Sequence, residues 1–135
     1  MKKAEKILKD FDLRKTNFRI ELVALFLNST SLTADDIKEK ISVTKDKVTI
    51  YRALEAFEKK CMIHRVPDKD NLIRYAFCQK NSSCSHDHNH AHFICNVCAD
   101  TFCIESINTP IIKNEEGFNI KKSKLILEGE CPSCQ

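Results

Sequence analysis

The hydrophobic residues at the start of the chain recur with helical spacing. Residues 4–11 are predicted to form a short amphipathic helix whose apolar side chains share one side. A second helix is expected to run to about Asn28, and either Thr16 or Asn17 can cap its start. The residues expected to face inward from this helix are Ile20, Val23, Ala24, Phe26 and Leu27.

Two further helices are predicted, with only a short connection between them. The third begins after Thr33 and ends near Ser42, and Ser42 or Thr44 can cap a fourth helix over residues 45–58. The residues expected on the core side of the fourth helix are Val48, Leu54, Phe57 and either Ile50 or Tyr51. Two short helices of this kind, the second with a basic start, are typical of a helix-turn-helix.

After the fourth helix the pattern changes to that of strands. Residues 62–66 and 72–77 predict two strands, and the turn-forming residues 67–71 lie between them. A helix-turn-helix followed by a two-stranded hairpin makes a winged helix, so residues 1–78 are predicted to be a winged-helix domain.

The remainder predicts a smaller unit of mixed structure. Strands are expected at 91–95 and 101–104, followed by a helix near 107–116 that ends at Gly117 and a last strand over 118–127. The fold class is therefore α+β. The expected order is an N-terminal winged helix-turn-helix domain at 1–78, a hinge with a histidine-rich loop at 79–90, and a small α/β domain at 91–135.

Composition indicates a folded protein, and the uneven distribution of charge suggests that the N-terminal part binds nucleic acid, with a merely solvated surface as the alternative. The chain is 42% hydrophobic and contains only two glycines and three prolines, which argues against long disordered linkers. Residues 1–78 hold 17 Lys and Arg against 12 Asp and Glu, whereas residues 79–135 hold 5 against 7. The first ten residues are too charged for a signal peptide and no apolar run is long enough for a membrane span, so a cytoplasmic protein is expected.

The outward face of the fourth helix is a candidate DNA-reading surface, and a solvated helix surface is the alternative. Lys45, Lys47 and Thr49 suit phosphates, Arg52 suits a phosphate or guanine, and Tyr51 offers a ring to a thymine methyl.

The chain also contains two Cys-x-x-Cys pairs. They are Cys95 with Cys98 and Cys131 with Cys134. Four thiolates can surround a tetrahedral zinc ion and leave no open position, which indicates a structural site. Two disulfides or a redox Cys-x-x-Cys are the alternatives, and the expected reducing compartment argues against them.

Histidines cluster just before the first cysteine pair. In a strand, side chains at i and i+2 share a face, so His90 and His92 can reach one ion. A solvated polar loop that binds metal incidentally is the alternative for His86 and His88. No candidate general base or oxyanion donor accompanies these histidines, which argues against an enzyme such as a zinc hydrolase.

These motifs together resemble the ferric uptake regulator family of metal-dependent repressors. The resemblance rests on Leu-Arg-Lys-Thr at 13–16 with Arg19, Thr-Ala-Asp-Asp-Ile at 33–37, Val-Thr-Ile-Tyr-Arg-Ala-Leu at 48–54, His-Ala-His-Phe-Ile-Cys at 90–95, Gly-Phe at 117–118 and Gly-Glu-Cys at 129–131. It implies a DNA-binding domain that includes Arg19, Tyr51 and Arg52, and a dimerisation domain with zinc on the four cysteines. It also implies a homodimer that binds an AT-rich inverted repeat and represses genes of metal uptake or homeostasis.

The resemblance further implies a regulatory metal between the two domains. The expected ligands, similar to those of the zinc uptake regulators of the family, are His64, Cys78, His90 and His92, with Cys103 as an alternative fourth ligand and His88 as a further candidate. A thiolate with imidazoles favours zinc, while iron or manganese would use more carboxylate. An iron-responsive or peroxide-sensing repressor remains the alternative within the family.

The chain departs from the family pattern at several positions. Ser31 stands where iron and peroxide sensors often have a histidine ligand, and Asn89 and Ala91 stand where an additional site would have histidines. Residues 81–88 resemble an insertion, and its Cys84, His86 and His88 are either extra ligands, a metal-capturing loop or spectators. Cys61 replaces a common glycine and is interpreted as a core or turn residue.

Overall fold

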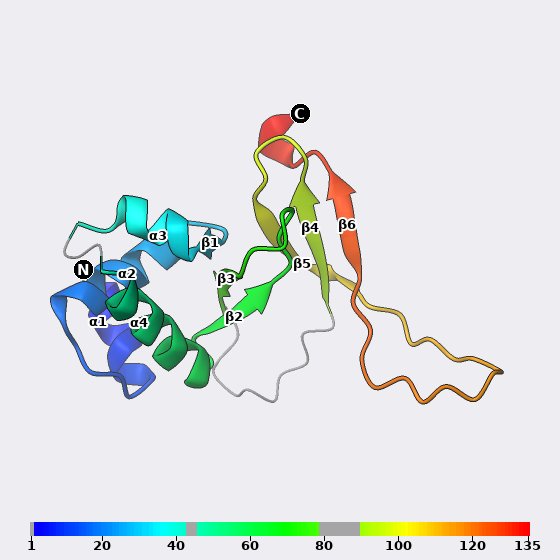
Figure 1. The fold of residues 1–135 in the computed structure, drawn as a ribbon, viewed down its shortest axis with the longest axis horizontal. Coiled ribbons are helices and arrows are strands. Elements are labelled where there is room, and N and C mark those ends of the chain that lie inside the picture. Colours follow the sequence, from blue (N-terminus) through cyan, green and yellow to red (C-terminus); the bar gives the residue numbers. More distant parts are fainter. Residues whose placement is uncertain (1, 43–45, 79–89) are drawn as a thin grey trace.

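The structure is a computed structural model that describes residues 2–42, 46–78 and 90–135. The N-terminal part, residues 2–78, contains all the helices α1 to α4 and a small sheet (Figure 1). The C-terminal part, residues 90–135, is a second sheet that lies beside the first. Within these described ranges, no helix combines the length and apolarity that crossing a bilayer requires.

The described residues of the N-terminal part contain four helices, and α2, α3 and α4 each follow a residue whose side chain caps the helix. They are α1 (Lys2–Asp10), α2 (Asn17–Leu27), α3 (Ala34–Lys40) and α4 (Lys47–Lys59). The Thr16 hydroxyl accepts the Arg19 N–H and starts α2. Thr33 and Asp36 form a reciprocal capping box at the start of α3, which satisfies two backbone N–H groups that a helix start leaves open.

The fourth helix differs from the prediction at its start and on one face. Its cap is Asp46, whose carboxylate accepts the Val48 N–H, rather than Ser42 or Thr44. Val48 is 55% exposed, so its predicted core position is wrong, while Ile50 is the buried member of the Ile50–Tyr51 pair. The helix buries Ile50, Ala53, Leu54 and Phe57 because these positions recur at helical spacing on one side.

One hydrophobic core holds the N-terminal part together. The largest of its fully buried side chains are Phe26, Phe57, Leu8, Leu22, Leu32, Ile37, Ile41, Ile50, Leu54, Met62 and Ile63. They come from every helix and from the small sheet, so the core fixes the position of α4 relative to the strands. Burial of each such side chain contributes about 1.5–3 kcal/mol.

The sheet of the N-terminal part is three-stranded and antiparallel. Its strands are β1 (Leu32–Thr33), β2 (Ile63–Val66) and β3 (Arg74–Phe77), in the order β1-β3-β2. The hairpin β2–β3 was predicted, but Leu72 and Ile73 precede β3 and are about half exposed. The two-residue strand β1 was not predicted, because it is too short to show alternation.

The C-terminal sheet combines antiparallel and parallel pairing. Its strands are β4 (His90–Cys95), β5 (Thr101–Asn108) and β6 (Ile126–Gly129), in the order β5-β4-β6, and the short 3-10 helix η1 (Pro132–Cys134) follows. β4 pairs antiparallel with β5 and parallel with β6, which aligns Cys95 with Gly129. The end of the chain is thereby placed beside the end of β4.

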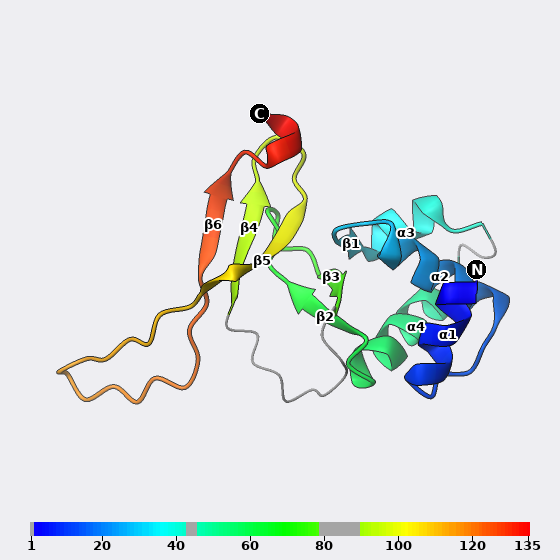
Figure 2. The same ribbon diagram turned by 180° about the vertical axis from the view of Figure 1, so that it is seen from behind.

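The predicted helix near 107–116 is wrong. β5 continues to Asn108, and residues 109–125 form an arm without regular secondary structure that projects from the sheet (Figure 2). Pro110 lacks an N–H and disfavours helical backbone at the residue before it, and β-branched Ile111 and Ile112 weaken helix formation further. Gly117, with φ +87°, allows the turn at residues 114–118, and the last strand begins at Ile126 rather than 118.

Candidate metal-binding sites and DNA-binding face

The four cysteines of the two Cys-x-x-Cys pairs converge at the end of β4. Ligand atoms of Cys95, Cys98, Cys131 and Cys134 all lie within 4.8 Å of one another. The sulfurs of Cys98 and Cys131 are 4.0 Å apart, close to the roughly 3.8 Å that two thiolates have around tetrahedral zinc. None of the four is in a disulfide in the structure, so the geometry fits a closed zinc site.

The backbone prepares Cys95 to be a thiolate. Its sulfur accepts the N–H groups of Val97, Cys98 and Cys131, each at 3.4 Å. These donors outweigh the effect of burial and lower the pKa of Cys95 to about 6, against an ordinary value near 9. A thiol that loses its proton readily binds a metal ion more tightly at neutral pH, because the ligand form is the thiolate.

A second cluster lies where the two parts of the chain meet. His64 comes from β2, His90 and His92 from β4, and Cys103 from β5. Their ligand atoms also lie within 4.8 Å of one another, and Nε2 of His64 is 3.9 Å from the Cys103 sulfur. The i, i+2 spacing places His90 and His92 together, with ring centroids 4.7 Å apart, and the strand register pairs His92 with Cys103.

Burial and nearby negative charge act on the thiol of this second cluster. Burial, followed by the charges of Glu105 and Cys78, raises the pKa of the Cys103 thiol to about 11. A divalent cation among the imidazoles would reverse this effect and favour the thiolate. Nδ1 of His64 and Nε2 of His90 and His92 are buried ring nitrogens. Three imidazoles and one thiol form a donor set that fits zinc.

Cys78 was also expected as a ligand, and it is not one of the four residues of this cluster. Cys78 directly follows β3, is 6% exposed, and is not among the four residues whose ligand atoms lie within 4.8 Å. The charge of Cys78 contributes to the raised pKa of Cys103. His88, which was expected as a further ligand, lies outside the described residues, as do Cys84 and His86.

Most of the predicted DNA-contacting side chains lie on the exposed face of α4. Lys47, Thr49, Tyr51 and Arg52 are exposed, and Tyr51 is 51% exposed despite its ring. The Thr49 hydroxyl donates to the Asp46 carboxylate at 2.9 Å and thus stabilises the start of the helix. The Arg19 guanidinium donates to the Arg14 carbonyl, and Lys45 lies outside the described residues.

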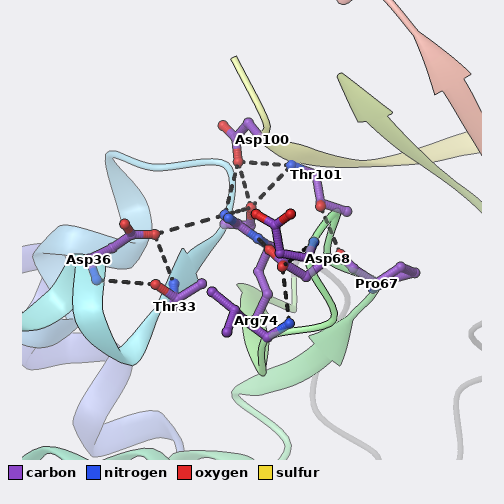
Figure 3. Close-up of polar contacts among 10 residues, drawn as sticks. Thr33, Asp36, Pro67, Asp68, Arg74, Asp100 and Thr101 are labelled. Atoms are coloured by element: carbon purple, nitrogen blue, oxygen red, sulfur yellow. Dashed lines mark hydrogen bonds and ion pairs between the residues drawn. The ribbon is translucent and has the colours of Figure 1, made fainter. Parts of the chain in front are cut away.

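Sequence reasoning missed a polar network that joins the two parts of the chain, which we call the Arg74 network (Figure 3). Its members are Ser31, Asp68, Arg74, Asp100 and Thr101. Arg74 donates to Asp68 at 2.7 Å, and this bond, with the N–H groups of Asp70 and Leu72, outweighs burial and lowers the pKa of Asp68. The sequence contained little indication of this network, because Ser31 was noted only as the residue that replaces a histidine metal ligand of related proteins.

A winged helix-turn-helix attached to a sheet with two metal-ligand clusters defines a metal-responsive DNA-binding transcription regulator. The model of the Ferric uptake regulator family matches residues 10–128, and the chain belongs to this family. Regulators of the family bind DNA, are generally dimeric and are not enzymes. The zinc hydrolase considered from the histidine cluster is thereby set aside.

Similar proteins include regulators named for iron uptake and one named for zinc uptake. A Ferric uptake regulation protein of Staphylococcus aureus (strain N315) is 31% identical over 137 residues, covering 98% of this chain and 96% of its own. A structure described as a zinc uptake regulator complexed with zinc and DNA has a TM-score of 0.60 at 22% identity, covering 98% of this chain and 91% of its own. The Vibrio cholerae ferric uptake regulator has a TM-score of 0.58 at 16% identity, with coverage of 94% and 98%. These structural likenesses show the fold.

Proposed function

We propose that the protein is a zinc-responsive repressor that controls genes of metal uptake or homeostasis. It would act as a homodimer on an AT-rich inverted repeat, with a structural zinc on Cys95, Cys98, Cys131 and Cys134. The observation that carries the proposal is the second cluster, in which His64 of the N-terminal part meets His90, His92 and Cys103 of the C-terminal part. An ion held there would be bound from both sides of the boundary.

The donor set supports zinc over iron and manganese. Zinc takes imidazole and thiolate ligands in tetrahedral sites, whereas manganese suits carboxylate oxygen and iron sensing is expected to use more carboxylate. Among residues 2–42, 46–78 and 90–135, the cluster contains three imidazoles and one thiol and no carboxylate. Around zinc, ligand atoms stand about 3.5 Å apart, so the observed separations need only a small contraction.

The mechanism is a shift between two arrangements of the N-terminal and C-terminal parts. An ion that binds only the closed arrangement favours it by the difference between its affinities for the two arrangements. In a dimer, the two α4 helices must enter major grooves about 34–36 Å apart. Closure sets their separation, so the sensor ion sets the affinity for DNA.

An electrophoretic shift assay on a promoter fragment tests this function. We expect Zn(II) to tighten binding about 5- to 150-fold over the sensor-metal-free protein, the usual range for such coupling, with Fe(II) and Mn(II) less effective. Binding should weaken as salt rises, because phosphate contacts release counterions. The same tightening with Fe(II) but not Zn(II) would replace the zinc proposal by the iron-responsive alternative, which the S. aureus relative favours by its name.

The identity of the sensor-site thiolate can be tested with cobalt. Because Cys103 lies in the cluster and Cys78 does not, Cys103→Ser is expected to abolish the sulfur-to-cobalt charge-transfer absorption of Co(II) at the sensor site. Cys78→Ser, a matched change of a nearby buried thiol, should retain it. Titration is done with the structural site filled with zinc. The opposite pattern would assign the ligand to Cys78, and loss in both variants would indicate that both thiols bind.

The DNA-reading role of α4 stays part of the proposal. Lys47, Thr49, Tyr51 and Arg52 occupy its exposed face, and together with Arg19 and Lys45 they form the proposed DNA-binding set. Lysines there would contact phosphates, whereas Arg52 and Tyr51 can reach base edges.

A further inference from the structure

The Arg74 network joins segments that are far apart in the sequence. The Ser31 hydroxyl, just before β1, donates to Oδ1 of Asp100 at 2.5 Å across 69 positions. The Ser31 hydroxyl oxygen also accepts hydrogen bonds from Nη1 of Arg74 at 3.0 Å and from the N–H of Thr101 at 3.3 Å. A hydroxyl has one donor and two acceptor sites, so all the hydrogen-bonding sites of the Ser31 hydroxyl are occupied. Its partners come from both parts of the chain.

Arg74 is placed where negative charges converge. Its Nη1 lies 3.6 Å from Oδ1 of Asp100 and 3.9 Å from Oδ2 of Asp36, while its Nε binds Asp68. The side chains of Arg74 and Asp68 are 11% and 3% exposed. Hydrogen bonds to charged groups that are largely buried are stronger than those between solvent-exposed groups, because the local dielectric constant is lower.

Two further hydrogen bonds lie beside the network and also join the N-terminal part to the C-terminal part. The Thr101 hydroxyl donates to the carbonyl of Pro67 at 2.7 Å, and Thr101 is 1% exposed. Lys69, at the tip of the β2–β3 loop, donates to the carbonyl of Asn96 at 3.4 Å. These bonds hold the loop that forms the wing to the segment that carries the first cysteine pair. Figure 1 shows this loop reaching from β2 toward the C-terminal sheet.

Both ends of the network are anchored in rigid structure. The carbonyl of Asp100 accepts the N–H of Cys95, so Asp100 is tied to the four-cysteine site. At the other end, Arg74 begins β3, and Asp36 belongs to the capping box that starts α3. A movement of the four-cysteine site relative to the helix-turn-helix would have to break these bonds.

We propose that Ser31, Arg74 and Asp100 form a second connection between the two parts, which positions the helix-turn-helix with or without the sensor metal. This inference rests on the proposed function for its effect on metal response. The sensor ion would then add to a preference for the closed arrangement that the hydrogen bonds of the Arg74 network already provide. Weakening the network lowers the closed fraction, so the apparent affinities for the sensor ion and, without that ion, for DNA should fall by the same factor.

Ser31→Ala tests the proposal with the smallest change of shape. We expect the Zn(II) concentration at half-saturation of the sensor site, measured without DNA, to rise about tenfold, the size of effect expected for losing a hydrogen bond to a charged group. DNA affinity of the sensor-metal-free protein should fall by a similar factor and return to the wild-type value at saturating zinc. Thr101→Val, which removes the Pro67 bond with little change in volume, should act in the same direction.

The matched control is Ser42→Ala. The Ser42 hydroxyl also donates to a carboxylate, that of Glu21 at 2.8 Å, but both residues belong to the N-terminal part. This variant should leave zinc half-saturation unchanged. The proposal is overturned by unchanged zinc half-saturation in Ser31→Ala, or by a loss of DNA affinity that saturating zinc does not restore, which would indicate a DNA contact or a folding defect.

Small-angle X-ray scattering separates this proposal from the proposed function. Without sensor metal and with the structural zinc retained, the full-length Ser31→Ala protein should have a larger radius of gyration than wild type. That result would support the network even if wild-type DNA binding proved insensitive to zinc, an outcome that would overturn only the zinc-responsive function. An unchanged radius of gyration would count against the network.

Discussion

Cys95→Ser is expected to yield protein whose C-terminal part is unfolded or that is monomeric, without structural zinc. The Cys95 side chain is fully buried and accepts three backbone N–H groups. Structural zinc contributes on the order of 10 kcal/mol to folding, which is comparable to the whole stability of a small domain, about 5–15 kcal/mol. Circular dichroism, metal analysis and sedimentation velocity measure the three consequences.

The control for this prediction is the same substitution in the other cluster. Cys103→Ser removes a thiol that the second cluster contributes, and it should leave a folded dimer that retains the structural zinc. Cys131→Ser should reproduce Cys95→Ser, because Cys131 is 2% exposed and lies in the same four-cysteine cluster. A zinc-containing, dimeric Cys95→Ser protein would show that the four-cysteine site is dispensable for folding.

His90→Ala is expected to yield a folded dimer whose DNA binding no longer responds to zinc. The histidine lies at the start of β4 and contributes one of the imidazoles that converge on His64 and Cys103. Without it the ion would lose its selective affinity for the closed arrangement. DNA affinity in saturating zinc should therefore fall to the metal-free level, a loss of about 5- to 150-fold.

This second prediction contains its own control. His90→Ala should retain the structural zinc, the thermal transition and the dimer of the wild-type protein, because Cys95 lies at the opposite end of β4. Unchanged zinc-dependent DNA binding in this folded dimer would remove His90 from the sensor site. Loss of the structural zinc would instead mean that the two sites fold as one unit.

The position of β4 explains why the two clusters, for which we propose different roles, lie so near each other. One six-residue strand begins at His90 and ends at Cys95, so it contributes a ligand to each cluster. Side chains of the second cluster face the N-terminal part, whereas Cys95 faces η1. A closed four-thiol site suits folding, and a site shared across the boundary suits regulation.

Local patterns determined most of the N-terminal part from sequence alone. The four helices, the cap Thr33 and the hairpin depend on residues a few positions apart, so periodicity and capping chemistry were sufficient to predict them. For α2 these patterns gave two cap candidates, Thr16 and Asn17, of which Thr16 is the cap. The four-cysteine cluster was predictable for a related reason. Two residues spaced by two can share an ion wherever the chain places them, and only a second such pair was needed.

Local patterns failed where tertiary contacts decide. Residues 107–116 contain enough apolar side chains to suggest a helix, yet Ile111 is 91% exposed within this single chain. Phe118, which follows in the same arm, is 74% exposed. Val48 has a residue type and spacing that suit a core, but it lies on the exposed side of α4. Periodicity indicates that one face is apolar and cannot specify what packs against it.

The sequence by itself determined which residues could bind metal or DNA, because that depends on their chemistry and local spacing. Only the tertiary structure decided which of them meet. It placed Cys103 in the cluster beside His64, although 39 positions separate the two residues, and it joined Ser31 to Asp100 across 69. Contacts over such separations arise from strand register and core packing, which are properties of the whole chain rather than of any segment.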